Sequence, residues 1–416
     1  MPANSATARY SGKIVRQHGA MEYSEAPVDL HKVREYRLER VREQLRRRDY
    51  AGILMFDQVN CRYAADATNM QIWCSHYETR CLFVATEGPV VLFDYMHLPH
   101  LAEELPLIDE YRVMPSFHYF TAADRGEERV KEFAREIADL VQQHGGGNKR
   151  LAIDRLSHMG VEALESLGIE PMEGLEITEL ARVIKSPEEL VLMEKSMEVC
   201  EAGIASMHEA LEPGITENAL WAKLHETNIR LGGEWIETRL LSSGPRTNPW
   251  FRECSMRAIE AGDMVCFDTD LVGPYGYCSD ISRGWICDAK PNDEQRRLYA
   301  AAYEQLKHNI SILKAGKEFR EVAEQAWRIP EEFHTLRYGS MGHGVGLADE
   351  YPSIKHWDVY DAKGYEGVFE ENMVFCVEAC IGVVDGQECV KLEEQVVITA
   401  DGTRQMSSYP LHDEWA

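Results

Sequence analysis

Hydrophobic positions in the first half of the chain follow two alternating periods, one typical of helices and one typical of strands. Residues 34–48 carry an apolar stripe that includes Leu38 and Leu45, so this segment is predicted to be a helix. A second helix is predicted over 127–143, because three consecutive glycines follow it. Short apolar runs predict strands at 53–56, 81–84, 90–93 and 151–153. This alternation indicates an α/β domain.

A strong helix-start signal opens the second half. Ser186 is a potential N-cap, Pro187 suits the first turn, and Glu189 completes a capping box. Apolar residues follow at helical spacing, namely Leu190, Met193, Met197, Cys200 and Ile204. Further helices are predicted from Thr216, over 299–313 and over 320–327. We therefore predict an N-terminal arm (1–30), an α/β domain (31–183) and a C-terminal domain (184–416).

Composition restricts the class of protein. Asp and Glu number 70 against 44 Lys and Arg, and the resulting net charge of −26 argues against nucleic acid and anionic membranes as partners. The chain has no apolar run of about 18 residues, and residues 1–16 lack the apolar segment of a signal peptide. The 11 cysteines show no CxxC pairing, so we expect reduced, buried thiols in a cytoplasmic protein. Thiolate ligation of zinc is the alternative for them.

Three carboxylates lie at one end of a predicted hairpin. Asp268 and Asp270 follow an apolar strand-like run, and Asp280 precedes another. The turn between the two strands is predicted at residues 273–276, which read Gly-Pro-Tyr-Gly. Clustered carboxylates repel one another and are costly to bury unless a cation neutralises them. The hairpin therefore predicts a site for a metal that prefers oxygen ligands.

Three residues further along the chain could complete this site. His343 lies in a glycine-rich segment, and Glu378 and Glu393 each follow a strand-like apolar run. Any one of these acids, taken singly, would be interpreted as solvated surface. Their shared position within apolar segments argues against that interpretation. One imidazole and five carboxylates could bind two divalent ions.

The order Asp, Asp, His, Glu, Glu and three motifs carry a family resemblance. The motifs are Gly-Tyr-Cys-Ser-Asp-Ile-Ser-Arg at 276–283, Gly-His-Gly-Val-Gly at 342–346 and Leu-Glu-Glu-Gln-Val-Val-Ile-Thr at 392–399. The C-terminal half resembles the pita-bread metallopeptidase and creatinase superfamily, which includes prolidase, aminopeptidase P and methionine aminopeptidase. The resemblance implies a creatinase-like N-terminal α/β domain followed by a pita-bread catalytic domain (an α/β, or α+β, class). It also implies that the metal ligands are Asp268, Asp280, His343, Glu378 and Glu393.

Three departures from the peptidase pattern change the expected chemistry. Asp349 stands where peptidases usually have a second histidine, and Trp250 stands where a further histidine usually follows a Ser-Gly-Pro turn. The Asp-x-Gly of the family reads Asp-Thr-Asp here, so Asp270 is an additional carboxylate and a sixth candidate ligand. These changes resemble the P-type dimethylsulfoniopropionate lyases of marine bacteria, a branch of the same superfamily.

This second resemblance implies a β-elimination. A zwitterionic sulfonium substrate would release dimethyl sulfide and leave acrylate, with Asp349 as the general base. The sulfonium would lie against aromatic faces, for which the candidates are Trp250, Tyr338, Tyr351 and Trp357. The resemblance further implies a homodimer with two divalent ions in each site. Iron is the first choice, and manganese, zinc or cobalt would also suit these ligands.

Three other functions stay open at this point. A Xaa-Pro dipeptidase or aminopeptidase, using a dimetal-bound hydroxide, would keep the ligands but would lack both of its histidines. A metal-free creatinase-like hydrolase would not need a complete ligand set, and neither would a pita-bread module without enzyme activity. Detection of dimethyl sulfide beside a Gly-Pro cleavage assay, with and without chelator, would separate these possibilities.

Overall fold

The computed structural model describes residues 12–13, 27–96 and 98–415, so most of the predicted arm over 1–30 lies outside the described residues. Internal contacts divide the chain into two units, Met1–Arg182 and Val183–Ala416. Among the described helices, none combines the length and the apolar character needed to cross a membrane.

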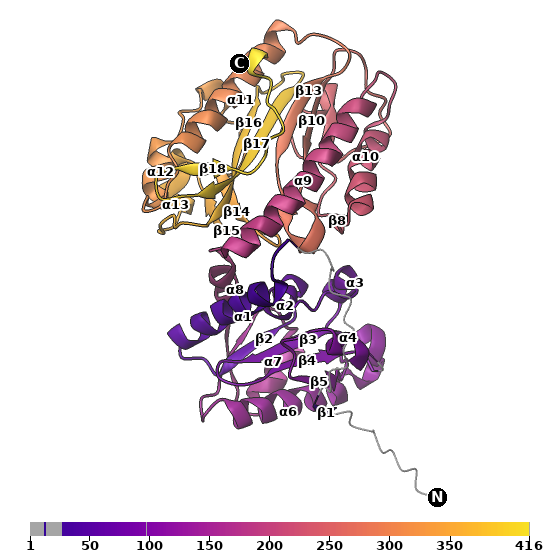
Figure 1. Cartoon of the computed structure of the whole chain (residues 1–416), viewed down its shortest axis with the longest axis vertical. Coiled ribbons are helices and arrows are strands. Elements are labelled where there is room, and N and C mark those ends of the chain that lie inside the picture. The colour runs from indigo at the N-terminus through magenta and orange to yellow at the C-terminus, as the bar shows by residue number, and fades with distance from the viewer. Residues whose placement is uncertain (1–11, 14–26, 97, 416) are drawn as a thin grey trace, which may run out of the picture. The chain divides into compact units, whose positions relative to one another are not determined.

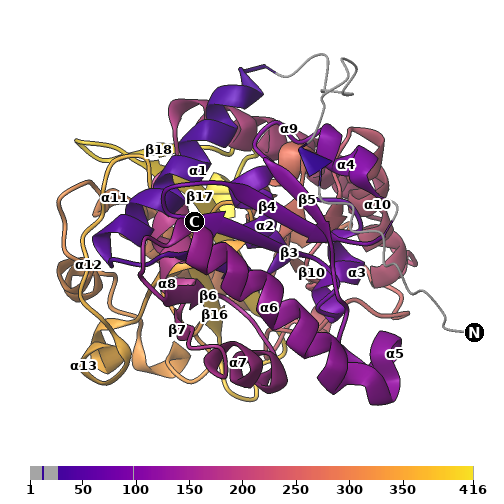
Figure 2. The same ribbon diagram turned by 90° about the horizontal axis from the view of Figure 1, so that it is seen from below.

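The first unit is a seven-stranded mixed sheet flanked by helices. The strands, in spatial order, are β1 (Gly12–Lys13), β5 (Glu110–Val113), β4 (Val90–Asp94), β3 (Cys81–Ala85), β2 (Gly52–Met55), β6 (Arg150–Ile153) and β7 (Glu170–Glu173). The helices are α1 (Leu30–Arg47), α2 (Gln58–Ala65), α3 (Gln71–His76), α4 (Pro99–Glu103), α5 (Tyr119–Ala122), α6 (Gly126–His144), α7 (His158–Glu165) and α8 (Leu175–Arg182). Within this unit α1, α2 and α8 lie on one side of the sheet, and α6 lies on the other (Figures 1 and 2). The predicted α/β class is confirmed.

The second unit contains three antiparallel sheets. The first consists of β13 (Ser282–Ile286), β10 (Met264–Asp268) and β9 (Leu241–Ser243). The second consists of β12 (Cys278–Ser279), β11 (Leu271–Val272) and β8 (Trp235–Ile236). The third consists of β15 (Asp349–Ile354), β14 (Gly342–Val345), β16 (Val374–Gly382), β17 (Cys389–Ile398) and β18 (Thr403–Gln405). The helices are α9 (Pro187–Ala210), α10 (Glu217–Arg230), α11 (Asp293–Ser311), α12 (Phe319–Gln325) and α13 (Tyr360–Lys363).

Capping residues set the helix starts in this unit. The Ser186 capping box before α9 is present as predicted, with Glu189 as its reciprocal partner. Helix α11 begins at Asp293 rather than at the predicted Tyr299, because Asn292 forms a capping box that starts the helix earlier. The prediction for α12 was also too long, since the helix ends at Gln325.

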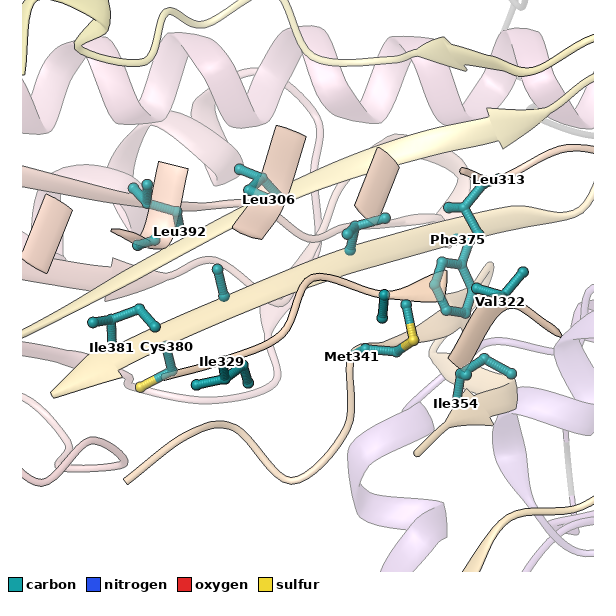
Figure 3. Close-up of a cluster of buried hydrophobic side chains, with 14 of the residues drawn as sticks. Leu306, Leu313, Val322, Ile329, Met341, Ile354, Phe375, Cys380, Ile381 and Leu392 are labelled. Atoms are coloured by element: carbon teal, nitrogen blue, oxygen red, sulfur yellow. The ribbon is translucent and has the colours of Figure 1, made fainter. Parts of the chain in front are cut away.

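The core beside the long strands is built from one face of α11 and one face of the third sheet. Helix α11 lies along β16 and β17 (Figure 1). Leu306 from this helix, together with Leu392 and Phe375 from the strands, belongs to one buried cluster (Figure 3). Burying such a side chain contributes about 1.5–3 kcal/mol relative to leaving it exposed. The cluster thus supports β16 and β17, the strands that carry two of the candidate ligands.

A buried ion pair ties β13 to β17. Arg283 Nη2 donates to Glu394 Oε1 at 2.7 Å, and both side chains are at most 2% exposed. The same guanidinium donates to the carbonyl oxygens of Glu393 and Tyr409. Burial raises the pKa of Glu394 to about 7 although Arg283 opposes this change. The carboxylate therefore depends on Arg283 to stay charged.

Replacing Arg283 by Met should lower the free energy of unfolding by about 3–5 kcal/mol, because Glu394 would be left buried without its partner. Urea denaturation followed by circular dichroism measures this change. The double variant Arg283→Met, Glu394→Leu should recover part of the loss, since it leaves no uncompensated charge. An unchanged unfolding free energy in the single variant would show that the ion pair contributes nothing to stability.

Candidate metal centre

The predicted hairpin is present, and it brings its three aspartates together. Strand β10 pairs with β13 so that Asp268 lies opposite Ser282. Beyond Asp268, β11 pairs with β12, and the tip contains a short helical turn at Pro274–Gly276. Asp270 has a φ of 37°, a backbone angle that non-glycine residues seldom adopt, and it turns the chain between β10 and β11. Asp268, Asp270 and Asp280 are all buried.

The third sheet supplies the other candidates from neighbouring strands. His343 on β14 lies opposite Cys376, and Glu378 on β16 lies directly opposite Glu393 on β17. Directly opposed like charges destabilise a sheet. Both glutamates are fully buried, so their carboxylates need a positive charge close by.

The six candidate ligands form two groups of three. Ligand atoms of Asp268, Asp270 and Asp280 lie within 4.8 Å of one another, and so do those of His343, Glu378 and Glu393. One group comes from the hairpin and the other from the third sheet. Two neighbouring groups of three suit two ions better than one, because each group can provide most of a coordination sphere.

The orientation of His343 suits metal binding. Its Nδ1 lies 3.0 Å from the carbonyl oxygen of Gly344, so a proton on Nδ1 would be donated there. The other nitrogen, Nε2, then faces the carboxylates with a free lone pair. It lies 3.2 Å from Glu378 Oε1, 3.6 Å from Asp280 Oδ2 and 3.7 Å from Glu393 Oε1.

The electrostatics of the centre indicate that a cation belongs there. Burial and the neighbouring Glu393 raise the pKa of Asp280 well above its usual range. Burial, Asp268 and Asp349 raise the pKa of Asp270 to about 8. Within the described part of the chain, Oε1 of Glu393 is buried and accepts no hydrogen bond. Divalent cations would relieve this repulsion and use the free oxygen, so the residues fit a metal centre.

Lys391 is a member of the site that the sequence interpretation missed. Its Nζ lies 3.1 Å from Asp268 Oδ2, 2.8 Å from Glu378 Oε2 and 2.7 Å from Glu393 Oε2. Burial alone would raise the pKa of Asp268, but Lys391 with Glu393 and Ser282 lowers it to about 2. One signal was present in the sequence: Lys391 stands two residues before Glu393 on a strand, so both side chains point to the same face.

Asp349 lies beside the metal candidates at the exposed side of the centre. Its Oδ1 is 3.7 Å from His343 Nδ1, and its side chain is 56% exposed. Partial burial of the carboxyl group raises the pKa of Asp349. Asp268 and Glu378 add to this rise, and His343 opposes it. The next residue, Glu350, is buried and forms an ion pair with Lys185, as the alternation along β15 requires. Asp349 is therefore a carboxylate held next to the centre and open to solvent.

Two of the four aromatic candidates, Tyr338 and Trp250, have different surroundings. The ring of Tyr338 lies 4.9 Å from Lys391 Nζ, which places it next to the carboxylates. Trp250 is 6% exposed and belongs to the hydrophobic cluster beneath the third sheet. Its Nε1 has no hydrogen-bond partner among the described residues. The adjacent Phe251, which the sequence interpretation passed over, is 59% exposed and contacts the ring of Tyr338 at 5.2 Å between centroids.

Tyr351 and Trp357 contact other parts of the second unit. Tyr351 packs against Tyr365 with ring centroids 5.6 Å apart. The ring of Trp357 lies under the guanidinium of Arg328, at 4.3 Å. Among the described contacts, neither ring touches a candidate ligand.

Two polar residues that the sequence did not indicate hold the surrounding loops. Thr238 donates to Asp270 Oδ2 at 2.6 Å and so orients this additional carboxylate. The buried Glu217 accepts hydrogen bonds from the backbone and hydroxyl groups of Ser243 and Ser255. It thereby fixes the two ends of the segment that carries Trp250.

All 11 cysteines are free and buried, as predicted. Cys376 lies within 4.8 Å of ligand atoms of Asp280 and His343. Its thiol has a strongly raised pKa, because burial and then Asp280 disfavour the thiolate.

Known proteins are similar to this chain over most of its length. Residues 191–400 match metallopeptidase family M24, and residues 37–185 match the creatinase/prolidase N-terminal domain. A dimethylsulfoniopropionate lyase DddP from Roseovarius nubinhibens is 44% identical over 92% of this chain and 87% of its own length. A second DddP, from Roseobacter denitrificans, is 40% identical over the same shares. The chain belongs to metallopeptidase family M24, in the DddP branch.

The peptidases of the family are more distant from this M24 chain. A Xaa-Pro dipeptidase from Pyrococcus furiosus is 30% identical over 54% of the chain and 63% of its own length. The solved structure of a Xaa-Pro dipeptidase from Bacillus anthracis superposes with a TM-score of 0.73 at 20% identity, over 91% of this chain and 98% of that one. This likeness confirms the expected fold of a creatinase-like domain followed by a pita-bread domain.

Proposed function

We propose that this chain is a metal-dependent lyase that cleaves dimethylsulfoniopropionate into dimethyl sulfide and acrylate. The observation that carries the proposal is Asp349, a solvent-open carboxylate beside His343 at the position where peptidases of the family have a histidine. The identities of 44% and 40% to two DddP lyases support it, because these relatives align over nearly the whole chain.

The residues of the centre would divide the chemistry between them. The two groups of three would hold two divalent ions, expected to be iron, with manganese, zinc or cobalt also suited to the ligands. Bound there, such ions supply Lewis-acid polarisation of the substrate carboxylate, which acidifies the adjacent C–H group. Asp349 would remove this proton. The C–H electrons then form the C=C bond of acrylate, the C–S bond breaks, and its electron pair leaves with dimethyl sulfide.

The surroundings of Asp349 suit a general base. Its raised pKa makes it a better proton acceptor than an ordinary aspartate, and its exposure lets it pass the proton to water afterwards. A cationic sulfonium would be attracted to aromatic faces, and Tyr338 is the candidate ring next to the carboxylates.

The peptidase alternative is disfavoured at two positions. Peptide hydrolysis in this family would use histidines where this chain has Asp349 and Trp250, and Trp250 lies in a hydrophobic cluster. The homodimer and the marine bacterial origin rest on the family resemblance, and the cytoplasmic location rests on the pattern of cysteine and apolar residues in the sequence. All three stay predictions.

Protein purified without added metal should contain two divalent ions per chain, within about 4 Å of each other. Elemental analysis measures the content. Asp270→Asn should lower it below two, because this carboxylate belongs to the hairpin group. The exposed Asp361→Asn serves as control and should retain both ions. One ion or fewer in fully active protein would contradict the dinuclear proposal.

Asp349→Asn should lower kcat for dimethyl sulfide release by roughly 10²–10⁴, the usual contribution of a positioned base. The amide keeps the size of the side chain but cannot accept the proton, so metal content and substrate binding should persist. Headspace gas chromatography gives the rate, and elemental analysis gives the metal content. Asp361→Asn should again behave as the unmodified protein.

The result for Asp349→Asn separates three roles. Near-normal activity in the fully metallated variant would refute the base assignment and indicate a turn residue, because Asn suits turns as well as Asp does. Loss of metal together with activity would make Asp349 a ligand instead. Gly-Pro cleavage by the unmodified protein, without dimethyl sulfide release, would favour the dipeptidase.

Tyr338→Leu and Trp250→Leu should each raise KM for the sulfonium substrate several-fold, because a cation–π contact contributes about 0.5–2 kcal/mol. The binding of propionate, which lacks the sulfonium, should change less in both variants. Since Trp250 is buried, its variant also needs an unfolding measurement. An equal loss of affinity for both ligands would show that the replaced ring only packs.

A further inference from the structure

Lys391 is enclosed on all sides within the candidate centre. Its side chain is 0% exposed, and its ammonium group is in contact with three carboxylates. The hydroxyl of Ser282 lies 2.8 Å from Nζ, and the ring of Tyr338 covers the group at 4.9 Å. A lysine seldom occupies such a position, because burial costs its hydration. These contacts therefore call for a function beyond packing.

The lysine forms an ion pair with both glutamates, and it also donates a hydrogen bond to Glu393. Its Nζ lies 2.8 Å from Oε2 of Glu378 and 2.7 Å from Oε2 of Glu393. The other oxygens, Oε1 in both residues, are turned toward Nε2 of His343, at 3.2 and 3.7 Å. One oxygen of each glutamate thus lies next to the ammonium group, and the other is presented to the space that the histidine also faces.

Ser282 extends this arrangement to the second group of ligands. Its Oγ lies 2.6 Å from Asp268 Oδ1 and 2.9 Å from Glu393 Oε2, and Lys391 lies 3.1 Å from Asp268 Oδ2. Asp268 belongs to the hairpin group, whereas Glu378 and Glu393 belong to the sheet group. Lys391 and Ser282 therefore connect the two groups.

We propose that Lys391 and Ser282 are positioning residues, which hold Asp268, Glu378 and Glu393 so that their remaining oxygens converge on the metal ions. The proposal rests on the metal centre of the proposed function but does not depend on the reaction that the centre catalyses. Partners of this kind behind metal ligands typically change metal affinity by 10–100-fold when they are removed.

The sign of the effect separates positioning from simple charge. Removing a positive charge beside a metal site should tighten cation binding, because one source of repulsion disappears. Removing a group that orients the ligands should weaken cation binding. Ser282 carries no charge, so its removal affects positioning alone.

The test measures Co²⁺ affinity by competition with a chelator, together with the visible absorption of the Co²⁺-loaded protein. Lys391→Met should weaken Co²⁺ binding by about 10–100-fold and alter the absorption spectrum, which reports ligand geometry. Ser282→Ala should weaken binding in the same direction by a smaller factor. Lys391→Arg, which keeps the charge and the donors, should restore much of the affinity. Lys363→Met, at an exposed position at the end of α13, is the control and should change neither readout.

Several outcomes would overturn the proposal. Tighter Co²⁺ binding by Lys391→Met would show that the lysine acts through charge alone. A lowered unfolding midpoint with unchanged affinity and spectrum would show a purely structural role. If Lys391→Met does not fold, Ser282→Ala decides, and unchanged Co²⁺ affinity in that variant refutes positioning. Unmodified protein that binds Co²⁺ but releases no dimethyl sulfide would refute the lyase and leave this proposal standing.

Discussion

The mutual repulsion of five buried carboxylates is the constraint on which the rest of the second unit depends. Asp268, Asp270, Asp280, Glu378 and Glu393 are all at most 8% exposed, and ligand atoms within each group of three lie within 4.8 Å. Charges so close together in a poorly hydrated space cannot all stay ionised without positive charge among them. The chain itself supplies one such charge, on Lys391. Burial and then the remaining repulsion raise the pKa of Asp280 and of Glu393, and this repulsion favours divalent cations at this place.

A site that repels itself needs a rigid support, and the surrounding structure provides one. Strands β16 and β17 pair along the whole length of β16 and rest on the cluster of apolar side chains beneath α11. The buried pair of Arg283 and Glu394 joins β17 to β13, the second strand of the hairpin. These contacts keep the backbone of the ligand-bearing strands in place, so the carboxylates cannot relax apart. The contacts that stabilise the fold thus also hold the ligands in position for the ions.

Under the proposed function, the same support can serve different reactions, because the catalytic differences would lie at its edge. The candidate ligands come from paired strands, whereas Asp349 lies at the start of β15, beside an irregular register between His343 and Gly344. Under the proposed function, a change of residue at that place would alter the group that faces the substrate and leave the paired strands that carry the ligands in place. This separation accounts physically for a fold shared with Xaa-Pro dipeptidases and a sequence closer to the DddP lyases.

The sequence by itself determined many of the element types and indicated the six candidate ligands. Periodicity located the helices and strands, since burial of one face imposes the spacing of apolar residues, and the carboxylates were conspicuous because they interrupt apolar runs. Helix ends were less certain, as α11 shows, because a capping box outweighed the apolar pattern. The tertiary structure alone decided which side chains meet. It placed Lys391 between two groups of ligands, buried Trp250 and exposed Phe251 against Tyr338. Such contacts join residues far apart in the chain, and no local pattern records them, because they depend on strand pairing and on how the sheets pack together.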